Sequence, residues 1–455
     1  MAAVAAITHA DAADAVAYRG AQRISAGDFV AQVEQVARRL PERPFLVNLC
    51  TDRCRFAVGL IAAMARGQVS LLPPNQTPDM LRRLQQHYGG LYVLSDSVQR
   101  PEILESMMYP ETQIRTQRTQ HFKVPAFPEN QIAAIAFTSG STGMPAPHRK
   151  SWGALTRGAT AELERFGLHR GERAGLVSTV PAQHMYGLES TVLMPLRGGL
   201  VMHAGRPFYP ADVAAALAQI PGDRVLVTTP VHLRALVTAG TALPKLRLVI
   251  CATAPLSPQL AALVEDRYEV PLQEVYGFTE AGMVATRRTV HGAIWQCLNH
   301  VRLRRVGDAA ASVRGGHIET EVACSDLIQP LGDHDFILHG RNADLVNIAG
   351  KRTSLGHLDH QLNSIEGVHD GVFLMPDEHG EGITRLTAFV VAPELGSDTV
   401  LRALRDRIDE VFLPRPLYFV AALPRNATGK LPREDLLRFA NDCAAAAARK
   451  KEEVG

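Results

Sequence analysis

The sequence predicts an α/β protein with a large N-terminal domain of parallel and mixed sheets covered by helices, followed by a small, mobile C-terminal α+β domain. Short apolar runs rich in β-branched residues alternate with amphipathic stretches along most of the chain, which is typical of strands that alternate with helices. Near residue 340 the pattern changes to a shorter β-α-β-β-α order. We therefore expect one domain over residues 1–341 and a second over 344–455.

The large domain is predicted from short apolar runs, each followed by a turn signal. Helical stretches with apolar residues on one face lie between these runs. The expected strands are 45–49, 69–74, 91–95, 132–137, 174–180, 225–229 and 246–251, and the expected helices include 56–66, 211–219 and 258–268.

The small domain is predicted from the remaining elements. After an apolar run at 336–341, the expected strands are 345–348, 371–375 and 386–391, and the expected helices are 355–365 and 398–412. The alanine-rich end, 444–455, is expected to be a frayed helix.

Composition excludes several classes of function. The 455 residues carry 48 basic and 46 acidic side chains, a formal net charge of +2, whereas nucleic-acid-binding domains usually show a strong basic excess. No segment approaches the roughly 18 uninterrupted apolar residues of a membrane helix, and the first residues lack the pattern of a signal peptide. The six cysteines form no CxxC pair. We expect a cytoplasmic protein with reduced thiols that binds neither nucleic acid nor membrane.

A run of hydroxyl and glycine residues follows the expected strand at 132–137. Glycine lets backbone N–H groups approach an anion closely, and hydroxyl groups add donors. Met144 follows the run in place of the lysine of a Walker A loop. The run indicates a polyphosphate loop of another type, or a flexible surface turn. It reads Thr138, Ser139, Gly140, Ser141, Thr142 and Gly143.

Three further segments accompany this loop in chain order. They are Tyr276-Gly277-Phe278-Thr279-Glu280, Gly332-Asp333 followed by Gly340-Arg341, and Asn426-Ala427-Thr428-Gly429-Lys430. Together with the loop they resemble the adenylate-forming superfamily of acyl-CoA synthetases, adenylation domains and luciferases. The resemblance implies a ligase that uses ATP and Mg²⁺ to convert a carboxylic acid into its acyl-adenylate, and then transfers the acyl group to a thiol.

The resemblance also implies a role for each matching residue. Lys430 matches the lysine that bridges the carboxylate, the α-phosphate and the ribose, which suits a reaction between two anions. Thr279 and Glu280 match a phosphate-binding threonine and a magnesium-binding glutamate, and Mg²⁺ prefers oxygen ligands. The matching ATP-binding positions are the loop Thr138 to Gly143, the adenine positions Thr253, Ala254, Pro255, Tyr276 and Gly277, and the ribose positions Asp333 and Arg341.

Two more groups of residues complete the predicted site. His184 matches a position near the acyl carboxylate, although a lone histidine is more often structural. Gly350 and Lys351 match the segment that faces the site after domain rotation, where a glycine lets a pantetheine arm pass. The acyl pocket is expected to contain His184, Tyr186, Gly187, Cys251 and Ala252, whose small residues leave room for a flat ring.

The chain departs from the family pattern at two positions. Ala146 stands where the family often has a lysine after the phosphate loop, so Arg149 or Lys150 is the candidate source of the missing charge. Ala343 stands at the usual aspartate pivot of the domain rotation, which removes a polar contact there. These departures motivate a second class of function, a degenerate nucleotide-binding or carrier-protein-docking subunit without catalysis. The retention of Lys430, Glu280 and Asp333 counts against that class.

The run from Gly143 to Lys150 and the short chain are similar to the 3-hydroxybenzoate–acyl carrier protein ligases of xanthomonadin and aryl-polyene pigment biosynthesis. This narrower resemblance implies an aromatic hydroxy acid as substrate and a holo-acyl carrier protein as acceptor. The arginines of the helix expected at 398–412 would meet an acidic carrier protein, or form a solvated face. CoA as the acceptor and a medium-chain fatty acid as the substrate remain open alternatives.

Overall fold

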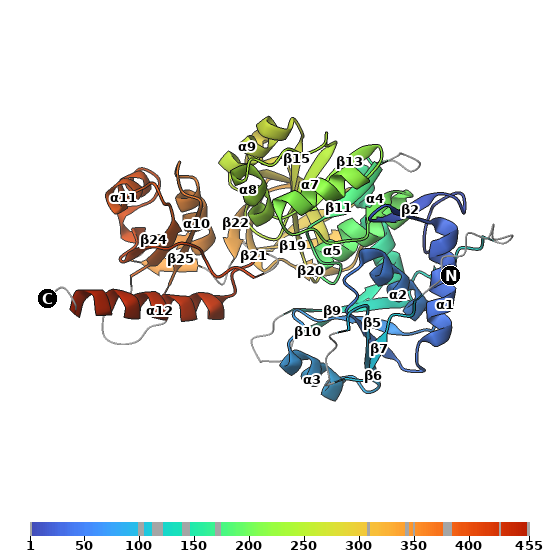
Figure 1. Cartoon of the computed structure of the whole chain (residues 1–455). Helices are drawn as coiled ribbons and strands as arrows, with labels where there is room; N and C mark the ends of the chain where they lie inside the picture. Colours follow the sequence, from blue (N-terminus) through green and yellow to red (C-terminus); the bar gives the residue numbers. More distant parts are fainter. Residues whose placement is uncertain are drawn as a thin grey trace.

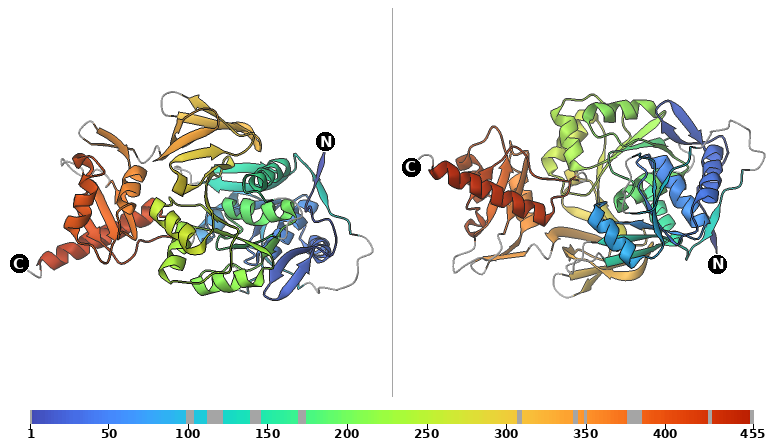
Figure 2. Two further views of the ribbon diagram at one scale, coloured as in Figure 1. Left: turned by 90° about the horizontal axis from the view of Figure 1, so that it is seen from above. Right: turned by 60° about the horizontal axis from the view of Figure 1, so that its bottom comes forward.

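The described residues form a large N-terminal part and a smaller C-terminal part that lie side by side (Figures 1 and 2). The large part contains mixed sheets covered by helices, which confirms the predicted fold class. The mobility of the smaller part and the domain boundary at 341–344 stay predictions. The computed structural model describes residues 2–98, 104–111, 122–138, 146–168, 174–306, 310–341, 345–348, 351–375, 385–426 and 429–452.

One sheet of six described strands comes from the first third of the chain. Its order is β10 (Ala146–Ser151), β9 (Ile132–Thr138), β5 (Val69–Leu72), β4 (Phe45–Asn48), β6 (Leu91–Ser95) and β7 (Ser106–Met108). The edge strand β10 is antiparallel to β9, and the others are parallel. Val47 and Leu71 face α3 (Pro78–His87), while Leu46 and Leu72 face the opposite core, because successive side chains of a strand alternate.

A larger sheet of eleven described strands holds the middle of the chain. Its order is β21 (Asp326–Pro330), β22 (Asp335–Arg341), β17 (Ile294–Cys297), β16 (Gly282–Arg287), β15 (Leu272–Phe278), β14 (Leu248–Cys251), β13 (Asp223–Thr228), β11 (Ala174–Ser178), β12 (Val201–His203), β2 (Ala15–Arg19) and β3 (Gln22–Ser25). The strands from β15 to β2 are parallel, and those at both ends are antiparallel. The loops after β11, β13, β14 and β15 therefore meet at one edge of the sheet.

Helices fill the space that the two sheets share. Three of them begin at a side-chain cap, where Ser25, Asp52 and Ser151 each accept from a backbone N–H three residues further on, which satisfies otherwise unpaired donors. The helices of this core are α1 (Ala26–Arg39), α2 (Arg53–Ala65), α4 (Trp152–Arg165), α5 (Met185–Leu188), the π-helical turn η1 (Glu189–Leu193) and α6 (Met194–Gly198).

The outer face of the larger sheet is covered by α7 (Pro210–Gln219), α8 (Pro230–Thr238) and α9 (Pro258–Tyr268). Val177, Leu226 and Val249 point into this layer. On the other face, the small sheet β18 (Arg302–Val306), β19 (Ala310–Gly315) and β20 (Ile318–Ala323) contributes to a separate core. The remaining elements here are β1 (Ala3–Ala5), paired with β8 (Ala126–Pro128), and the 3₁₀ turn η2 (Thr289–His291).

The smaller part buries cores of its own, built from residues between Val346 and Leu436. Its elements are β23 (Leu345–Ile348), β24 (Lys351–Ser354), α10 (Leu355–Asn363), β25 (Asp370–Leu374), β26 (Thr387–Val391), α11 (Ser397–Arg405), the 3₁₀ turn η4 (Glu410–Phe412), β27 (Leu417–Phe419) and α12 (Arg433–Glu452). In Figure 1, α12 leads away from the large part to the C-terminus.

Two regions show how the structure departs from the sequence-based expectation. The helix predicted at 398–412 ends at Arg405, and a 3₁₀ turn follows after Asp409, whose side chain accepts from Val411 N–H. The antiparallel strands β16 to β20 were not predicted. In β18 and β20 many side chains are exposed and charged and give no long apolar run, whereas β16 is largely buried.

All six cysteines are free thiols. Within the described ranges, every helix is too short or too polar to cross a bilayer.

A matched pair of leucines on α9 tests the covering layer of the larger sheet. Leu260 is 6% exposed and Leu263 is 54% exposed. We expect Leu260→Ala to lower the free energy of unfolding by about 2–3 kcal/mol, because it leaves a cavity, and Leu263→Ala to change it by less than about 0.5 kcal/mol. Urea unfolding followed by circular dichroism measures both, and equal losses would contradict the assigned packing.

Candidate active site

A lysine near the C-terminus meets a histidine of the large part, although 246 residues separate them in the chain. The Nζ atom of Lys430 lies 3.4 Å from Nε2 of His184. The preceding Gly429 has a φ of +78° and packs against α8, where a Cβ would come within 3.2 Å of Val231 Cγ2. Glycine therefore lets the loop carrying Lys430 approach the larger sheet closely.

An ion pair of the smaller part fixes this loop. Arg425 donates from Nε and Nη2 to both carboxylate oxygens of Asp370, at 2.7 and 2.8 Å, and from Nη1 to the carbonyl of Gly429 at 3.1 Å. Asn426 accepts at Oδ1 from the backbone N–H of Lys430 at 3.0 Å. A bidentate ion pair restricts the positions of both partners. Asp370, the first residue of β25, therefore fixes Arg425, and Arg425 fixes the loop that carries Lys430.

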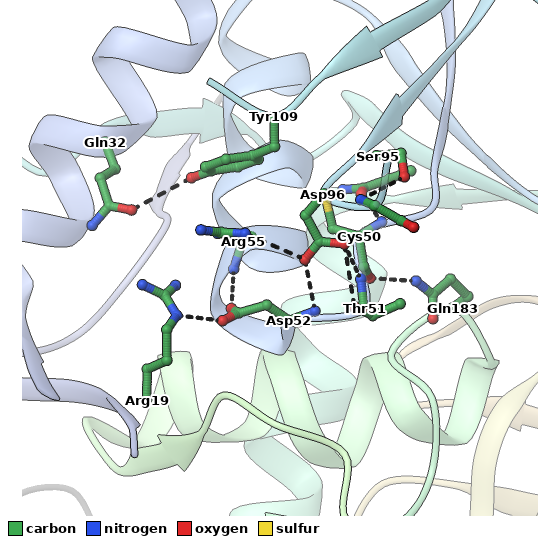
Figure 3. A network of polar contacts seen from close by, with 12 residues as sticks. Arg19, Gln32, Cys50, Thr51, Asp52, Arg55, Ser95, Asp96, Tyr109 and Gln183 are labelled. Atoms are coloured by element: carbon green, nitrogen blue, oxygen red, sulfur yellow. Dashed lines mark hydrogen bonds and ion pairs between the residues drawn. The ribbon is translucent and has the colours of Figure 1, made fainter. Parts of the chain in front are cut away.

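A network of polar contacts holds Gln183, the residue before His184 (Figure 3). The neighbouring Gln183 donates from Nε2 to the carbonyl of Cys50 at 2.7 Å. Asp96 accepts from the backbone N–H groups of the two residues that follow Cys50, at 2.8 and 3.0 Å, and the second of these, Asp52, caps α2. The segment with His184 is thus tied to the carboxyl edge of the six-stranded sheet.

The residues predicted for the acyl pocket lie close to this histidine. The Oη atom of Tyr186 donates to the main-chain carbonyl of the residue before Cys251 at 3.0 Å. A Cβ on Gly187 would come within 1.9 Å of the carbonyl oxygen of Pro181, so the close approach requires glycine. Cys251 and Ala252 are buried, and burial raises the pKa of the Cys251 thiol well above its usual range, which keeps the thiol neutral.

Glu274 is a positioning residue that the sequence analysis missed. Its Oε1 accepts from the backbone N–H of Leu256 at 3.1 Å, and its Oε2 accepts from Arg287 Nε at 2.7 Å and from Thr289 Oγ1 at 2.8 Å. These bonds compensate for burying the carboxylate and fix the loop of Thr253, Ala254 and Pro255, in which Thr253 has a φ of +83°. The sequence signal that could have revealed this residue is a single acidic side chain, Glu274, within a strand of mostly apolar residues.

Tyr276 lies in a core of aromatic rings. It is 7% exposed, and its ring centroid lies 5.8 Å from that of Trp295 and 5.6 Å from that of Phe336. Its Oη donates to Oδ2 of Asp326 at 2.6 Å. The next residue, Gly277, is exposed, so the main chain of the strand is accessible at this point. The adenine-binding roles of Tyr276 and Gly277 stay predictions.

The two residues predicted to hold the ribose lie at opposite ends of one hairpin. Arg341 pairs with Asp326 at one end of β21 and β22, whereas Asp333 lies in the turn beyond the Pro330–Phe336 pair. That separation is at least roughly 13 Å along the strands. The Asp333 side chain is 69% exposed and forms an ion pair with Arg302 at 3.4 Å. The structure therefore places Asp326, and not Asp333, opposite Arg341.

Thr138, which opens the predicted phosphate loop, and Glu280 both lie beside His148. Its Nε2 lies 3.0 Å from Oγ1 of Thr138 and 3.6 Å from Oε1 of Glu280. The Glu280 side chain is 34% exposed, and Thr279 beside it is half-buried. A carboxylate and a hydroxyl at one accessible spot form the oxygen set that Mg²⁺ and phosphate prefer.

Some predicted residues cannot be placed in this arrangement. The structure describes the main chain of Arg341 and Lys351 in β22 and β24, but not their side chains. The residues outside the described ranges are Ser139, Gly140, Ser141, Thr142, Gly143, Ala343 and Gly350.

Comparison with known proteins identifies the family. The profile of the family described as AMP-binding enzyme matches residues 5–315. A 4-coumarate–CoA ligase of Rhodobacter capsulatus is 31% identical over 321 residues, covering 68% of this chain and 78% of that protein. The chain therefore belongs to the AMP-binding enzyme family, and it is an adenylate-forming acid–thiol ligase that uses ATP and Mg²⁺.

Other relatives and solved structures agree on the fold. A 4-coumarate–CoA ligase of Halorhodospira halophila is 31% identical over 306 residues, covering 65% of this chain and 73% of that protein. The crystal structure of ATP-bound MatB from Rhodopseudomonas palustris superposes with a TM-score of 0.80 at 19% identity, covering 96% of this chain and 97% of that one. The o-succinylbenzoate CoA synthetase of Bacillus subtilis in complex with AMP gives 0.77 at 16% identity, covering 93% and 95%.

The protonation of His184 has a measurable consequence. Burial, and then the nearby Lys430 ammonium, lower the pKa of His184 to about 3, whereas an unfolded histidine titrates near ~6.5. As the pH falls from about 6.5 towards 3, only the unfolded chain gains this proton, so the folded state loses stability across that window. We expect the free energy of unfolding of His184→Gln to fall less than that of the wild type as the pH is lowered from 6.5 to 4.

Urea unfolding at several pH values measures this difference. The exposed His291 provides a control, since His291→Gln should follow the wild-type profile. Parallel profiles of His184→Gln and the wild type would show that the folded protein does not exclude the proton from His184.

Proposed function

We propose that this protein adenylates an aromatic carboxylic acid and transfers the acyl group to the thiol of CoA. The observation that carries this proposal is the approach of Lys430 to His184 beside the buried segment of Tyr186 and Cys251. The 4-coumarate–CoA ligases that resemble the chain favour both an aromatic acid and CoA.

In the first step, a carboxylate oxygen of the acid attacks the α-phosphorus of ATP, and pyrophosphate leaves. Lys430 supplies a cation between two anionic reactants, which would otherwise repel each other. His184 stays neutral because its pKa is lowered to about 3, so it accepts from Lys430 at Nε2 and orients the ammonium. In the second step the thiol attacks the acyl carbon, AMP leaves, and the thiol gives up its proton.

The described residues fit a nucleotide and its metal ion. Glu280 offers an accessible carboxylate for Mg²⁺, which would neutralise charge on the departing pyrophosphate. Thr138 and Thr279 offer hydroxyl groups to the phosphates. Asp326, which Tyr276 orients from 2.6 Å, takes the ribose role that the sequence analysis gave to Asp333, because it lies opposite Arg341.

The residues of the predicted acyl site favour a flat substrate. The hydroxyl of Tyr186 is committed to a main-chain carbonyl, so its ring offers an apolar wall and its position is fixed. Ala252 adds little bulk beside it. A hydroxybenzoate fits this description as well as a longer aryl acid, and we retain it as the candidate from the narrower resemblance.

A carrier protein is the second candidate acceptor. Arg402 and Arg405 on α11, together with Arg407, are exposed, and such a surface would complement an acidic carrier domain. CoA and a carrier protein present the same pantetheine arm, so Gly350 and Lys351 are proposed to admit either.

The role of Lys430 is tested by substitution. We expect Lys430→Ala to slow acid-dependent ATP–pyrophosphate exchange about a hundredfold or more, because the transition state loses its positioned cation. The exposed Lys245 provides a matched control, and Lys245→Ala should exchange at the wild-type rate. Exchange by Lys430→Ala at the wild-type rate would remove Lys430 from the mechanism.

Substrate and acceptor are tested in sequence. A panel of 4-coumarate, hydroxybenzoates, benzoate and octanoate in pyrophosphate exchange should rank the aromatic acids first. The preferred acid is then offered with CoA or with holo-acyl carrier protein, and thioester formation is measured by mass spectrometry. We expect CoA to be acylated; acylation of the carrier protein alone would favour the second candidate, and ATP binding without any acid-dependent AMP release would contradict the ligase.

A further inference from the structure

One face of the edge strand β10 is directed at the turn that carries Glu280. His148 and Lys150 are two residues apart, so their side chains share this face, while Arg149 between them is exposed because strand side chains alternate. β10 belongs to the six-stranded sheet, whereas Glu280 follows β15 of the larger sheet. The contacts made by this face therefore join the two sheets directly beside the phosphate loop.

Lys150 holds the main chain of the turn. Its residue is only 8% exposed, and its Nζ donates to the carbonyl oxygen of Glu280 at 2.8 Å. Removing an ammonium group from water is costly unless hydrogen bonds and opposite charge compensate. The hydrogen bond to Glu280 anchors the ammonium on the turn, and the buried carboxyl group of Glu189 on η1 attracts it electrostatically.

Close packing on the far side of the turn limits its movement further. Gly282 has a φ of +81°, and a Cβ there would come within 2.4 Å of Oε1 of Glu189. The residues that follow Glu280 are thus packed against the Glu189 carboxyl group, which also attracts the Lys150 ammonium. The turn has little room to shift while this arrangement is intact.

His148 holds the side chain that the turn presents. Its Nε2 lies 3.6 Å from the Glu280 carboxylate and 3.0 Å from the hydroxyl of Thr138. Thr138 begins the phosphate loop, so His148 relates the position of that loop to the position of Glu280. Neither His148 nor Lys150 needs to touch the nucleotide for this effect.

We propose that His148 and Lys150 are positioning residues that preset the Glu280 carboxylate for Mg²⁺, Lys150 through the main chain of the turn and His148 through its side chain. This inference rests on the proposed function, since it assigns Mg²⁺ to Glu280. It also gives a different role to the lysine that was the candidate replacement for the loop lysine missing at Ala146. The ammonium group of Lys150 on β10 is buried and donates to the carbonyl of Glu280. It stabilises the turn that would bind the metal ion, and it does not contact the phosphates itself.

Equilibrium binding separates this role from a general structural one. Calorimetric titration of the full chain with ATP is carried out over a range of Mg²⁺ concentrations, and with AMP, which lacks the β- and γ-phosphates. We expect Lys150→Met to raise the Mg²⁺ concentration needed for half-maximal ATP binding roughly tenfold, the scale of one lost hydrogen bond to a charged group, and to leave AMP affinity within about twofold. Lys245→Met, at an exposed lysine, should match the wild type in both titrations.

His148→Ala provides a second variant at a less buried position. This variant should also raise the Mg²⁺ concentration needed for half-maximal ATP binding, by a smaller factor than Lys150→Met. If Lys150→Met fails to fold, His148→Ala is used to test the proposal. An unchanged Mg²⁺ requirement, or an equal loss of AMP affinity, would overturn the positioning role. If the wild type forms no acyl-adenylate with any acid, the proposed function fails first; if it does and the Mg²⁺ requirement is unchanged in the variants, only this inference fails.

Discussion

The contact between Lys430 and His184 depends on two separately anchored segments, and the candidate active site is formed where they meet. Lys430 is placed by the Arg425–Asp370 ion pair of the smaller part, and His184 by the bond from Gln183 to the large part. Each anchor is a short, directional polar contact between residues far apart in the chain. A shift of about 1 Å in either one would change the geometry of a charge-stabilising group, to which such reactions are sensitive.

The larger sheet explains why so many candidate residues gather in one place. Its parallel strands end at a common edge, and the loops after β11, β14 and β15 carry His184, Thr253 and Glu280. Ligands of open α/β sheets bind at this edge. The buried carboxylate of Glu274 supports the loop of Thr253 through its bond to Leu256 N–H, and its bonds to Arg287 and Thr289 offset the cost of burying its charge.

Lys150 illustrates how a departure from a family pattern can be absorbed by the structure. The loop after the phosphate-binding run lacks its usual lysine, yet a lysine four residues further along the chain reaches the Glu280 turn from an edge strand. The six-stranded sheet thereby contributes to a site that otherwise belongs to the larger sheet. The two sheets are joined at the point where the metal ion and the phosphates are expected.

The sequence alone determined the alternation of strands and helices, the run at 138–143 and the motif ending at Lys430, because these depend on neighbouring residues and local backbone preference. It did not distinguish Asp326 from Asp333, since a Gly-Asp pair in a turn and an aspartate opening a strand give no different local signal. Nor did it reveal the partners of Lys150 or Glu274. Only the tertiary structure decided these, because the Lys150 bond spans 130 residues and the Glu274 bonds join separate elements, so both depend on how the chain packs.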